Sequence, residues 1–292
     1  MKIGFFAVGI GHLAQPDLIK TVAVNAERLN FGTVWAPEHV VLLDSHISKY
    51  PYSKGEFPLP ADTAFADPFV TLAYAAAYTS RVKLATGICL VPEHNPVVLA
   101  KVVATLDQLC KGRFVLGVGV GWLEEEFNAV GVPWEHRAQR TRECIDAMRR
   151  LWADPHSSSG GEFYKFNNVR SYPKPARGEV PIWFGGETGP ALKRVAEYGN
   201  GWCGFNLTPA EAAEKIGRLD QLLKAAGRKR SDIYMALSPY SKPITRDDLK
   251  RYSDLGVEEL ALVEFSPPSS ERDLIAKMEQ MARDWVDPAA KL

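Results

Sequence analysis

Glu38 and His39 form an adjacent ionisable pair shortly after a short apolar run, Thr33–Trp35. The run has the composition of a buried β-strand, and the end of such a strand is where barrel enzymes place their reactive groups. Imidazole transfers protons near neutral pH, and a neighbouring carboxylate tunes its pKa. The pair therefore predicts acid–base chemistry by His39 and Glu38, although loop hydrogen bonding alone would also explain both residues.

Glycine-rich segments end two further predicted strands. In Thr86-Gly87-Ile88 the glycine allows a ligand to approach the backbone closely. Gly117, Gly119 and Gly121 lead into Trp122 after the following strand. Their spacing partly mimics a dinucleotide fingerprint, but that fingerprint follows the first strand and requires an acidic residue about 20 positions on. We therefore predict that these glycines let a flat ligand lie against the strand ends.

A third glycine-rich loop, Gly185-Gly186-Glu187-Thr188-Gly189, opens a predicted helix at Pro190. Backbone amides at a helix N-terminus form a phosphate site, because free N–H groups coincide there with the positive end of the helix dipole. We predict phosphate binding by this loop. The alternative is an ordinary capped loop in which Thr188 is the helix cap.

Other charged residues have simpler explanations. The acidic triplet Glu124–Glu126 is typical of a helix start, where carboxylates meet the positive end of the dipole. His94 precedes Asn95-Pro96, so we interpret it as a helix-entry residue. Solvent or a subunit contact explains a basic helix face, which consists of Arg137, Arg140, Arg142, Arg149 and Arg150.

The elements that must position these groups alternate regularly along the chain. Apolar runs of β-forming residues predict strands at Lys2–Val8, Thr33–Trp35, Val82–Ile88, Arg113–Val118, Pro181–Phe184, Gly201–Gly204, Ile233–Leu237 and Glu259–Glu264. Helical spacing and capping residues predict helices at Pro16–Leu29, Pro68–Tyr78, Pro96–Leu109, Glu135–Trp152, Pro190–Tyr198, Pro209–Ala226, Arg246–Leu255 and Glu271–Asp284. This alternation predicts an α/β fold, a (β/α)8 TIM barrel.

Two segments interrupt this rhythm. Residues 40–66 are too long for an ordinary strand–helix loop and carry prolines and aromatic residues, so we predict a lid over the barrel mouth. Residues 156–180 predict a hairpin or an irregular insertion. No boundary divides the chain, and we expect one domain over residues 1–292.

Composition excludes several classes of function. The 292 residues carry 35 basic and 35 acidic side chains, and no basic stretch indicates nucleic acid as a partner. No apolar run is long enough to span a membrane, and no secretory leader is expected. The four cysteines are far apart in sequence, so we expect reduced thiols in a cytoplasmic protein and no metal site.

In their order along the chain, these motifs resemble the luciferase-like monooxygenase superfamily, and in particular its branch that uses coenzyme F420, a 5-deazaflavin. The resemblance covers nearly the whole chain. Its marks are M-K-I-G-F-F, F-G-T-V-W-A-P-E-H, Y-P-Y-S-K-G-E-F-P-L-P, L-A-T-G-I-C-L-V-P-E-H-N-P, G-R-F-V-L-G-V-G-V-G-W-L-E-E-E-F, an R-x-x-R-x-x-E helix ending in L-W, and P-I-W-F-G-G.

The resemblance implies roles for the residues at the strand ends. Glu38 and His39 match an acid–histidine pair beside the deazaflavin ring, where many relatives have Asp in place of Glu38. Gly87-Ile88 matches a non-proline cis peptide that backs the ring. The remaining matches are loops, with Gly119 and Gly121 beside the cofactor, Trp122 where some deazaflavin dehydrogenases carry a catalytic Glu, and Gly185–Gly189 at the cofactor phosphate.

The leading hypothesis is therefore an oxidoreductase that transfers a hydride between F420 and a small organic substrate. An FMN-dependent monooxygenase of the same family is the first alternative. A metal-dependent hydrolase using Glu38, His39 and His94 and a non-catalytic cofactor carrier are the others. We expect a homodimer that binds a small-molecule substrate.

Overall fold

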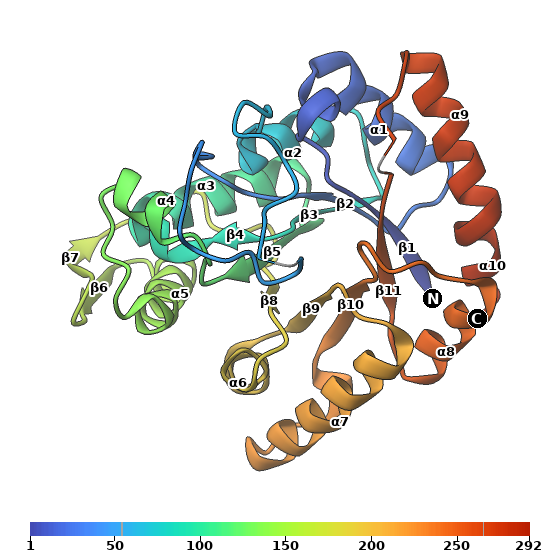
Figure 1. Cartoon of the computed structure of the whole chain (residues 1–292). Coiled ribbons are helices and arrows are strands. Elements are labelled where there is room, and N and C mark those ends of the chain that lie inside the picture. Colours follow the sequence, from blue (N-terminus) through green and yellow to red (C-terminus); the bar gives the residue numbers. More distant parts are fainter. Residues whose placement is uncertain (54, 265) are drawn as a thin grey trace.

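The computed structural model describes residues 1–53, 55–264 and 266–292, in which eight parallel strands close into a barrel (Figure 1). The barrel strands are β1 (Lys2–Phe6), β2 (Thr33–Ala36), β3 (Lys83–Thr86), β5 (Phe114–Gly119), β8 (Ile182–Gly185), β9 (Gly201–Phe205), β10 (Tyr234–Ser238) and β11 (Glu259–Val263). They pair in the order β3-β2-β1-β11-β10-β9-β8-β5, and β3 pairs with β5 to close the ring. The predicted (β/α)8 barrel is confirmed.

Helices surround the barrel on its outside (Figure 1). The long helices are α1 (Pro16–Arg28), α2 (Pro68–Ala76), α3 (Pro96–Leu109), α5 (Arg137–Ala153), α6 (Gly189–Tyr198), α7 (Pro209–Ala225), α8 (Arg246–Asp254) and α9 (Glu271–Met281). Shorter elements are η1 (Gly11–Ala14), η2 (Val91–Glu93), α4 (Glu124–Ala129), η3 (Arg230–Asp232), η4 (Ala282–Val286) and α10 (Asp287–Ala289). The long helices begin and end within a few residues of the predicted bounds.

Local capping explains where several helices begin. Asn95 accepts a hydrogen bond from Val97 N at 2.9 Å, and Pro96 takes the first helical position of α3, where its missing N–H costs nothing. Asp67 caps α2 in the same way, accepting from Val70 N at 2.8 Å. At α7, Thr208 and Glu211 form a reciprocal capping box.

The barrel interior is packed by large and small side chains in alternation. Two indole rings, Trp35 and Trp183, lie with their centroids 5.7 Å apart, and alanines on neighbouring strands make room for them. Below them Glu259 is fully buried and accepts hydrogen bonds from Trp35 Nε1 and Thr33 Oγ1, each at 2.8 Å. The interior is therefore solid at this level, and the open space lies towards the C-terminal ends of the strands.

The prediction of one continuous strand over Val82–Ile88 was wrong in one respect, because the strand is interrupted. β3 ends at Thr86, and a two-residue strand, β4 (Cys89–Leu90), resumes the pairing with β5. Between them the Gly87-Ile88 peptide bond is cis, which confirms the cis peptide implied by the family resemblance. The Thr86 hydroxyl donates a hydrogen bond to Gly117 O at 2.7 Å, so this side chain connects two neighbouring strands within the barrel wall.

The two inserted segments behave differently. The segment 156–180 contains an antiparallel hairpin of β6 (Ser157–Gly160) and β7 (Lys165–Val169), as predicted, and the hairpin lies to one side of the barrel (Figure 1). The segment 40–66 crosses the mouth of the barrel, and its described part is irregular apart from isolated bridges at Tyr50 and Phe65. Within the described residues, no helix has both the length and the apolar character needed to cross a membrane.

Candidate active site

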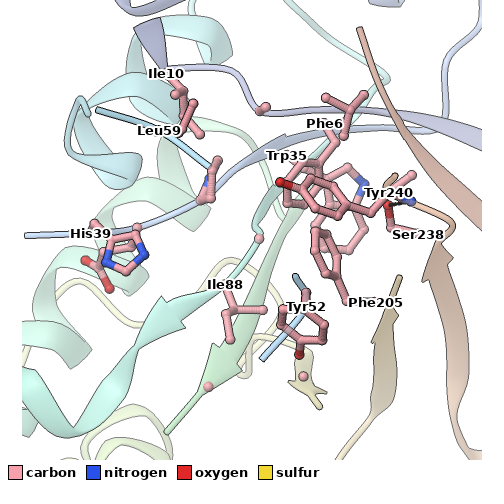
Figure 2. A pocket seen from close by; sticks show the side chains of 18 of the residues that line it. Phe6, Ile10, Trp35, His39, Tyr52, Leu59, Ile88, Phe205, Ser238 and Tyr240 are labelled. Carbon is pink, nitrogen blue, oxygen red and sulfur yellow. Dashed lines mark hydrogen bonds between the residues drawn. The ribbon is translucent and has the colours of Figure 1, made fainter. Parts of the chain in front are cut away.

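The C-terminal ends of the strands surround a cavity of about 1130 Å³. Figure 2 shows side chains that line it, with His39, Ile88 and the aromatic residues coming from separate elements. Most of the sequence-predicted site residues line this one cavity: Glu38, His39, Gly87, Ile88, Gly119, Gly121, Trp122, Gly185, Gly186, Glu187 and Thr188. Thr86 and Gly189 are not among the lining residues, and Thr86 is fully buried in the strand.

His39 is held by a carboxylate that sequence reasoning did not connect with it. Its Nδ1 lies 2.8 Å from Glu126 Oε2, and the two side chains are 9% and 1% exposed. Three aromatic rings, Phe57, Phe65 and Trp122, meet the imidazole edge-on at centroid distances of 5.1, 5.4 and 5.9 Å. Because Nδ1 is engaged by Glu126, Nε2 is the ring nitrogen left to act on a ligand.

The acidic triplet does begin a helix, α4, as predicted, but two of its carboxylates also bind the segment 40–66. Glu126 Oε1 accepts hydrogen bonds from Val40 N at 2.6 Å and Val41 N at 3.2 Å. Glu125 Oε1 accepts from Ile47 N at 2.6 Å and from Ser48 N at 3.2 Å. The start of α4 therefore fixes both His39 and the first part of the segment that follows it.

Glu38 faces a different partner. Its carboxylate accepts hydrogen bonds from Leu90 N at 2.5 Å and from the Cys89 thiol, and lies 2.9 Å from His94 Nε2. Ligand atoms of Glu38, Cys89 and His94 all lie within 4.8 Å of one another, and hydrogen bonds to Glu38 account for the other two. His39, which the metal-hydrolase alternative required beside Glu38 and His94, is bound to Glu126 instead.

The surroundings of this cluster raise the pKa values of His94 and Glu93 for different reasons. Burial acts to lower the pKa of His94, but the hydrogen bond and the charge of Glu38 outweigh it and leave that pKa raised. Glu93, on η2, has both carboxylate oxygens buried without a hydrogen-bond partner. Burial, together with the charges of Glu126 and Glu38, raises the pKa of Glu93 to about 9, so this carboxyl group is neutral at pH 7.

Two of the glycines are also required by internal packing, while their predicted place beside a flat ligand stays a prediction. A Cβ at Gly119 would collide with the end of the Ile88 side chain. Gly121 has φ of +78°, and a Cβ there would lie 2.5 Å from Phe127 Cε2. At Gly186 (φ +99°) the nearest heavy atom to a Cβ is the Ala191 Cβ at 3.0 Å, so backbone approach is possible at that position.

Glu187, in the loop predicted to bind phosphate, is hydrogen-bonded to other parts of the chain. Its carboxylate accepts a hydrogen bond from Phe205 N at 2.7 Å and another from the Tyr52 hydroxyl. Burial raises the pKa of Glu187 to about 7 despite these bonds. Thr188 caps α6 through Ala191 N at 3.4 Å, as the alternative reading of this loop expected. Phosphate binding by this loop stays a prediction, and Gly186 is its position where the backbone can be approached.

Aromatic side chains form one wall of the cavity (Figure 2). The Phe205 ring lies 5.7 Å from Phe6, 4.9 Å from Tyr52 and 4.5 Å from Tyr240, measured between centroids. All four residues line the cavity. No local sequence signal distinguished Phe205 from a core residue, because its exposure depends on the loops that follow β9 and β10.

A family model described as luciferase-like monooxygenase matches residues 1–283. The chain belongs to this family. It is therefore an enzyme of the luciferase-like class, whose relatives include F420-dependent and FMN-dependent oxidoreductases and monooxygenases acting on small molecules.

Individual relatives support the same placement. An uncharacterized protein of Mycobacterium tuberculosis, Rv0953c, is 36% identical over 262 residues, which cover 88% of this chain and 90% of that protein. The F420-dependent glucose-6-phosphate dehydrogenase of Intrasporangium calvum is 31% identical over 239 residues, covering 80% of this chain and 62% of that enzyme.

The fold is shared with solved structures. One is the oxygenating constituent of 3,6-diketocamphane monooxygenase of Pseudomonas putida, a type II Baeyer-Villiger monooxygenase in complex with FMN. It matches with a TM-score of 0.66 and 18% sequence identity, over 86% of this chain and 70% of that chain. This likeness shows the fold, while the curated relatives include an F420-dependent and an FMNH(2)-dependent enzyme.

Arg137 and Arg194 also line the cavity. The basic face of α5 was expected to meet solvent or a subunit, and for Arg137 that expectation was wrong. Its guanidinium lies over the Trp134 ring at 3.6 Å from the centroid, at the edge of the cavity. Sequence periodicity placed Arg137 on the polar side of the helix, but this residue is the first of α5 and so lies at the barrel mouth.

Proposed function

We propose that this enzyme transfers a hydride between coenzyme F420 and a small organic substrate. The observation that carries the proposal is the position of His39, whose ring is fixed by Glu126 and lines the same cavity as the cis Gly87-Ile88 peptide. The similarity to an F420-dependent dehydrogenase over 80% of the chain favours the deazaflavin over FMN.

The cavity suits a flat ring that carries an anionic tail. Trp35, Ile88 and Phe205 give it apolar walls, and Gly186 leaves the backbone open at the start of α6. Arg137 and Arg194 add two positive charges whose Nε atoms have no hydrogen-bond partner. When bound, the deazaflavin would supply the carbon that accepts or gives the hydride.

In this proposal the chain's own residues position the reactants and move one proton. His39 exchanges a proton at Nε2 with the substrate heteroatom, while the substrate carbon loses or gains the hydride. Glu126 holds Nδ1 and stabilises the protonated ring. Glu38 acts from the other side of the strand end by fixing Leu90 N and His94. Phe57, Phe65 and Trp122 keep water from the imidazole.

Direct binding measurements test the cofactor assignment. The dissociation constants of F420 and FMN are measured on the same purified protein, and tighter binding of F420 is expected. Markedly tighter binding of FMN, together with oxygen consumption on reduction, would assign the enzyme to the FMN-dependent monooxygenases instead. Tight binding without turnover of any electron donor or acceptor would favour a non-catalytic carrier.

We also propose that the segment 40–66 is a lid that orders further when substrate binds. Its tip is fastened across the cavity, because Asn206 Nδ2 donates to Tyr52 O at 3.0 Å and Tyr52 bonds to Glu187. Loop closure of this kind shields reduced cofactor from water. Hydrogen exchange should slow in this segment when cofactor and substrate are added. Equal protection with and without ligands would indicate a static loop.

We propose a contact surface for the expected homodimer. The outer faces of α2 and α3 carry Val70, Val98 and Leu109, which are 70%, 62% and 62% exposed. Apolar side chains grouped on adjacent helices are typical of subunit contacts. Sedimentation analysis should give twice the chain mass, and Val70→Asp with Val98→Asp should restore the monomer.

We further propose one domain over residues 1–292, working in the cytoplasm, where its free cysteines stay reduced.

A further inference from the structure

We propose that the aromatic wall of the cavity is a substrate subsite for an uncharged aromatic ring, so that the substrate is an aromatic alcohol or carbonyl compound. The aromatic wall consists of Phe6, Tyr52, Phe205 and Tyr240, which come from β1, the segment 40–66, β9 and the loop after β10. The inference rests on the proposed function, because it takes the cofactor ring to lie against the Gly87-Ile88 peptide in the same cavity.

The cavity has room for a second ligand beside a cofactor ring. Its volume of about 1130 Å³ exceeds the roughly 300–1,000 Å³ of pockets that hold one small molecule. Figure 2 shows Tyr52, Phe205 and Tyr240 grouped on one side of the view and His39 on the other, with Ile88 between them. A substrate ring at the aromatic wall and a cofactor ring against Ile88 would therefore share one cavity with His39.

Backbone conformation and hydrogen bonds hold the aromatic wall in place. Tyr240 has φ of +50°, and Asn206, which follows Phe205, has φ of +56°. A left-handed conformation is uncommon at a residue as bulky as tyrosine and persists only where its surroundings impose it. Ser241 Oγ donates to Asn206 Oδ1 at 3.1 Å, and Tyr240 N donates to Ser238 Oγ at 3.2 Å. The loops after β9 and β10 thus present a pre-formed surface, which a ligand can bind without the cost of ordering it.

The rings of the aromatic wall offer both faces and edges to a ligand. The plane of the Phe205 ring makes angles of 33° with Tyr240, 44° with Phe6 and 70° with Tyr52. An aromatic ligand has a negative face and a positive edge, so it gains from offset and edge-to-face contacts beyond the apolar area that it buries. A saturated ring of similar size lacks this charge distribution. The aromatic wall is therefore expected to prefer an aromatic ligand.

The charged residues of the cavity favour a neutral ligand at the aromatic wall. Among the described residues that line the cavity, the only arginine or lysine side chains are Arg137 and Arg194, which the proposed function assigns to an anionic tail. Each lining carboxylate, on Glu38, Glu187 and Glu264, already accepts hydrogen bonds within the chain. An ionised substrate group would therefore lose its hydration at the aromatic wall without gaining an equivalent partner.

Three ketones test the inference by binding alone. Acetophenone is aromatic and neutral, cyclohexyl methyl ketone is neutral with a saturated ring, and 4-acetylbenzoate is aromatic and anionic. Ligand-observed NMR titrations give their dissociation constants, in one series without cofactor and in another with F420 at saturation. In both series acetophenone should bind about 3- to 10-fold more tightly than cyclohexyl methyl ketone. With F420 bound, 4-acetylbenzoate should bind about 10-fold more weakly than acetophenone or worse.

Substitutions in the aromatic wall test whether its rings cause this preference. Phe205→Leu keeps an apolar side chain and removes the central ring, so it should lose the preference for acetophenone over cyclohexyl methyl ketone. Phe6→Leu repeats the test from β1 should the first variant not fold. Phe166→Leu makes the same change on β7, outside the cavity, and as the matched control it should bind all three ketones as the wild type does. Melting temperatures establish that each variant is folded.

Equal binding of the two neutral ketones in both series, or no binding of either, would overturn the inference. A preference for acetophenone that the folded leucine variants of the wall retain would overturn it too, as would equally tight binding of 4-acetylbenzoate beside F420. Loss of acetophenone binding on saturation with F420 would assign the aromatic wall to the cofactor ring instead. Failure of F420 to bind would count against the proposed function, while the series without cofactor would still decide the subsite.

Discussion

Two glutamate–histidine pairs lie next to each other after the end of β2, and they join it to different elements. His39 and Glu38 both line the cavity, but His39 pairs with Glu126 of α4, whereas Glu38, its neighbour in sequence, pairs with His94 ahead of α3. The His39–Glu126 pair is nearly sealed, with side chains 9% and 1% exposed, while His94 keeps 24% of its side chain exposed. Adjacent residues thus belong to separate networks.

The separation follows from the partners of the two side chains. Glu38 and His39 lie just beyond the end of β2, and their side chains reach different elements. One points towards β4 and η2 and stabilises the backbone there, and the other points towards the lid and α4. We therefore expect the His39 pair to serve the proposed chemistry and the Glu38 pair mainly to stabilise the barrel wall.

The largest expected effect comes from breaking the pair that faces the cavity. His39→Asn removes proton transfer at Nε2 and should lower turnover on the order of 100-fold. Steady-state kinetics with a saturating substrate provide the measurement. His156→Asn, on the exposed β6–β7 hairpin, is the matched control. An unchanged rate in the His39 variant would remove this residue from the mechanism.

Glu126→Gln should have the next largest effect. We expect its kcat to fall by about 10- to 100-fold, because the amide no longer stabilises a protonated imidazole. Glu125→Gln separates the two roles of α4, since it weakens the hydrogen bonds to Ile47 and Ser48 and leaves His39 untouched. If both variants lose kcat equally, lid anchoring rather than His39 explains the effect of Glu126.

Breaking the other pair should cost stability more than activity. Glu38→Gln weakens the bonds to Leu90 N, Cys89 and His94, and we expect the free energy of unfolding to fall by about 1–3 kcal/mol. Urea denaturation measures this value, with kcat of the same preparation recorded alongside. A loss of kcat as large as that of His39→Asn, with stability unchanged, would reverse the roles assigned to the two pairs.

The Glu38–His94 pair should also give stability a pH dependence. The pKa of His94 is raised in the folded state, so its contribution is fully present below the unfolded value of 6.5 and disappears as pH rises through the folded value. The stability difference between wild type and His94→Gln should therefore shrink on going from pH 6 upward. A difference that stays constant across this range would contradict a charged pair.

The smallest expected effect is a gain in stability of the variant rather than a loss. Glu93 lies between the two pairs with its pKa raised from 4.5 to about 9, so folding requires a proton that the unfolded chain has lost. Stability therefore falls as pH rises through this window, and Glu93→Gln should escape the fall. We expect the variant to melt about 2 °C higher than the wild type at pH 8 and equally at pH 4.5. Glu162→Gln, on the exposed hairpin, should show no such difference.

Much of the fold follows from local sequence patterns. Short β-forming runs alternate with helices that begin at proline and capping residues, and the structure has the predicted barrel with helix ends close to the predicted bounds. The interruption of the third strand was missed because Val82–Ile88 has the composition of one short continuous strand, and only the pairing with β5 shows where the strand breaks.

The sequence by itself determined which residues come to the barrel mouth, because position at the C-terminal end of a strand follows from the strand pattern. This placed Glu38, His39 and the Gly185–Thr188 loop around one cavity. Tertiary structure alone decided their partners. Glu126 lies 87 positions from His39, and Arg194 and Arg137 line the same cavity from different helices. Such contacts depend on how distant elements pack, which no local period or spacing encodes.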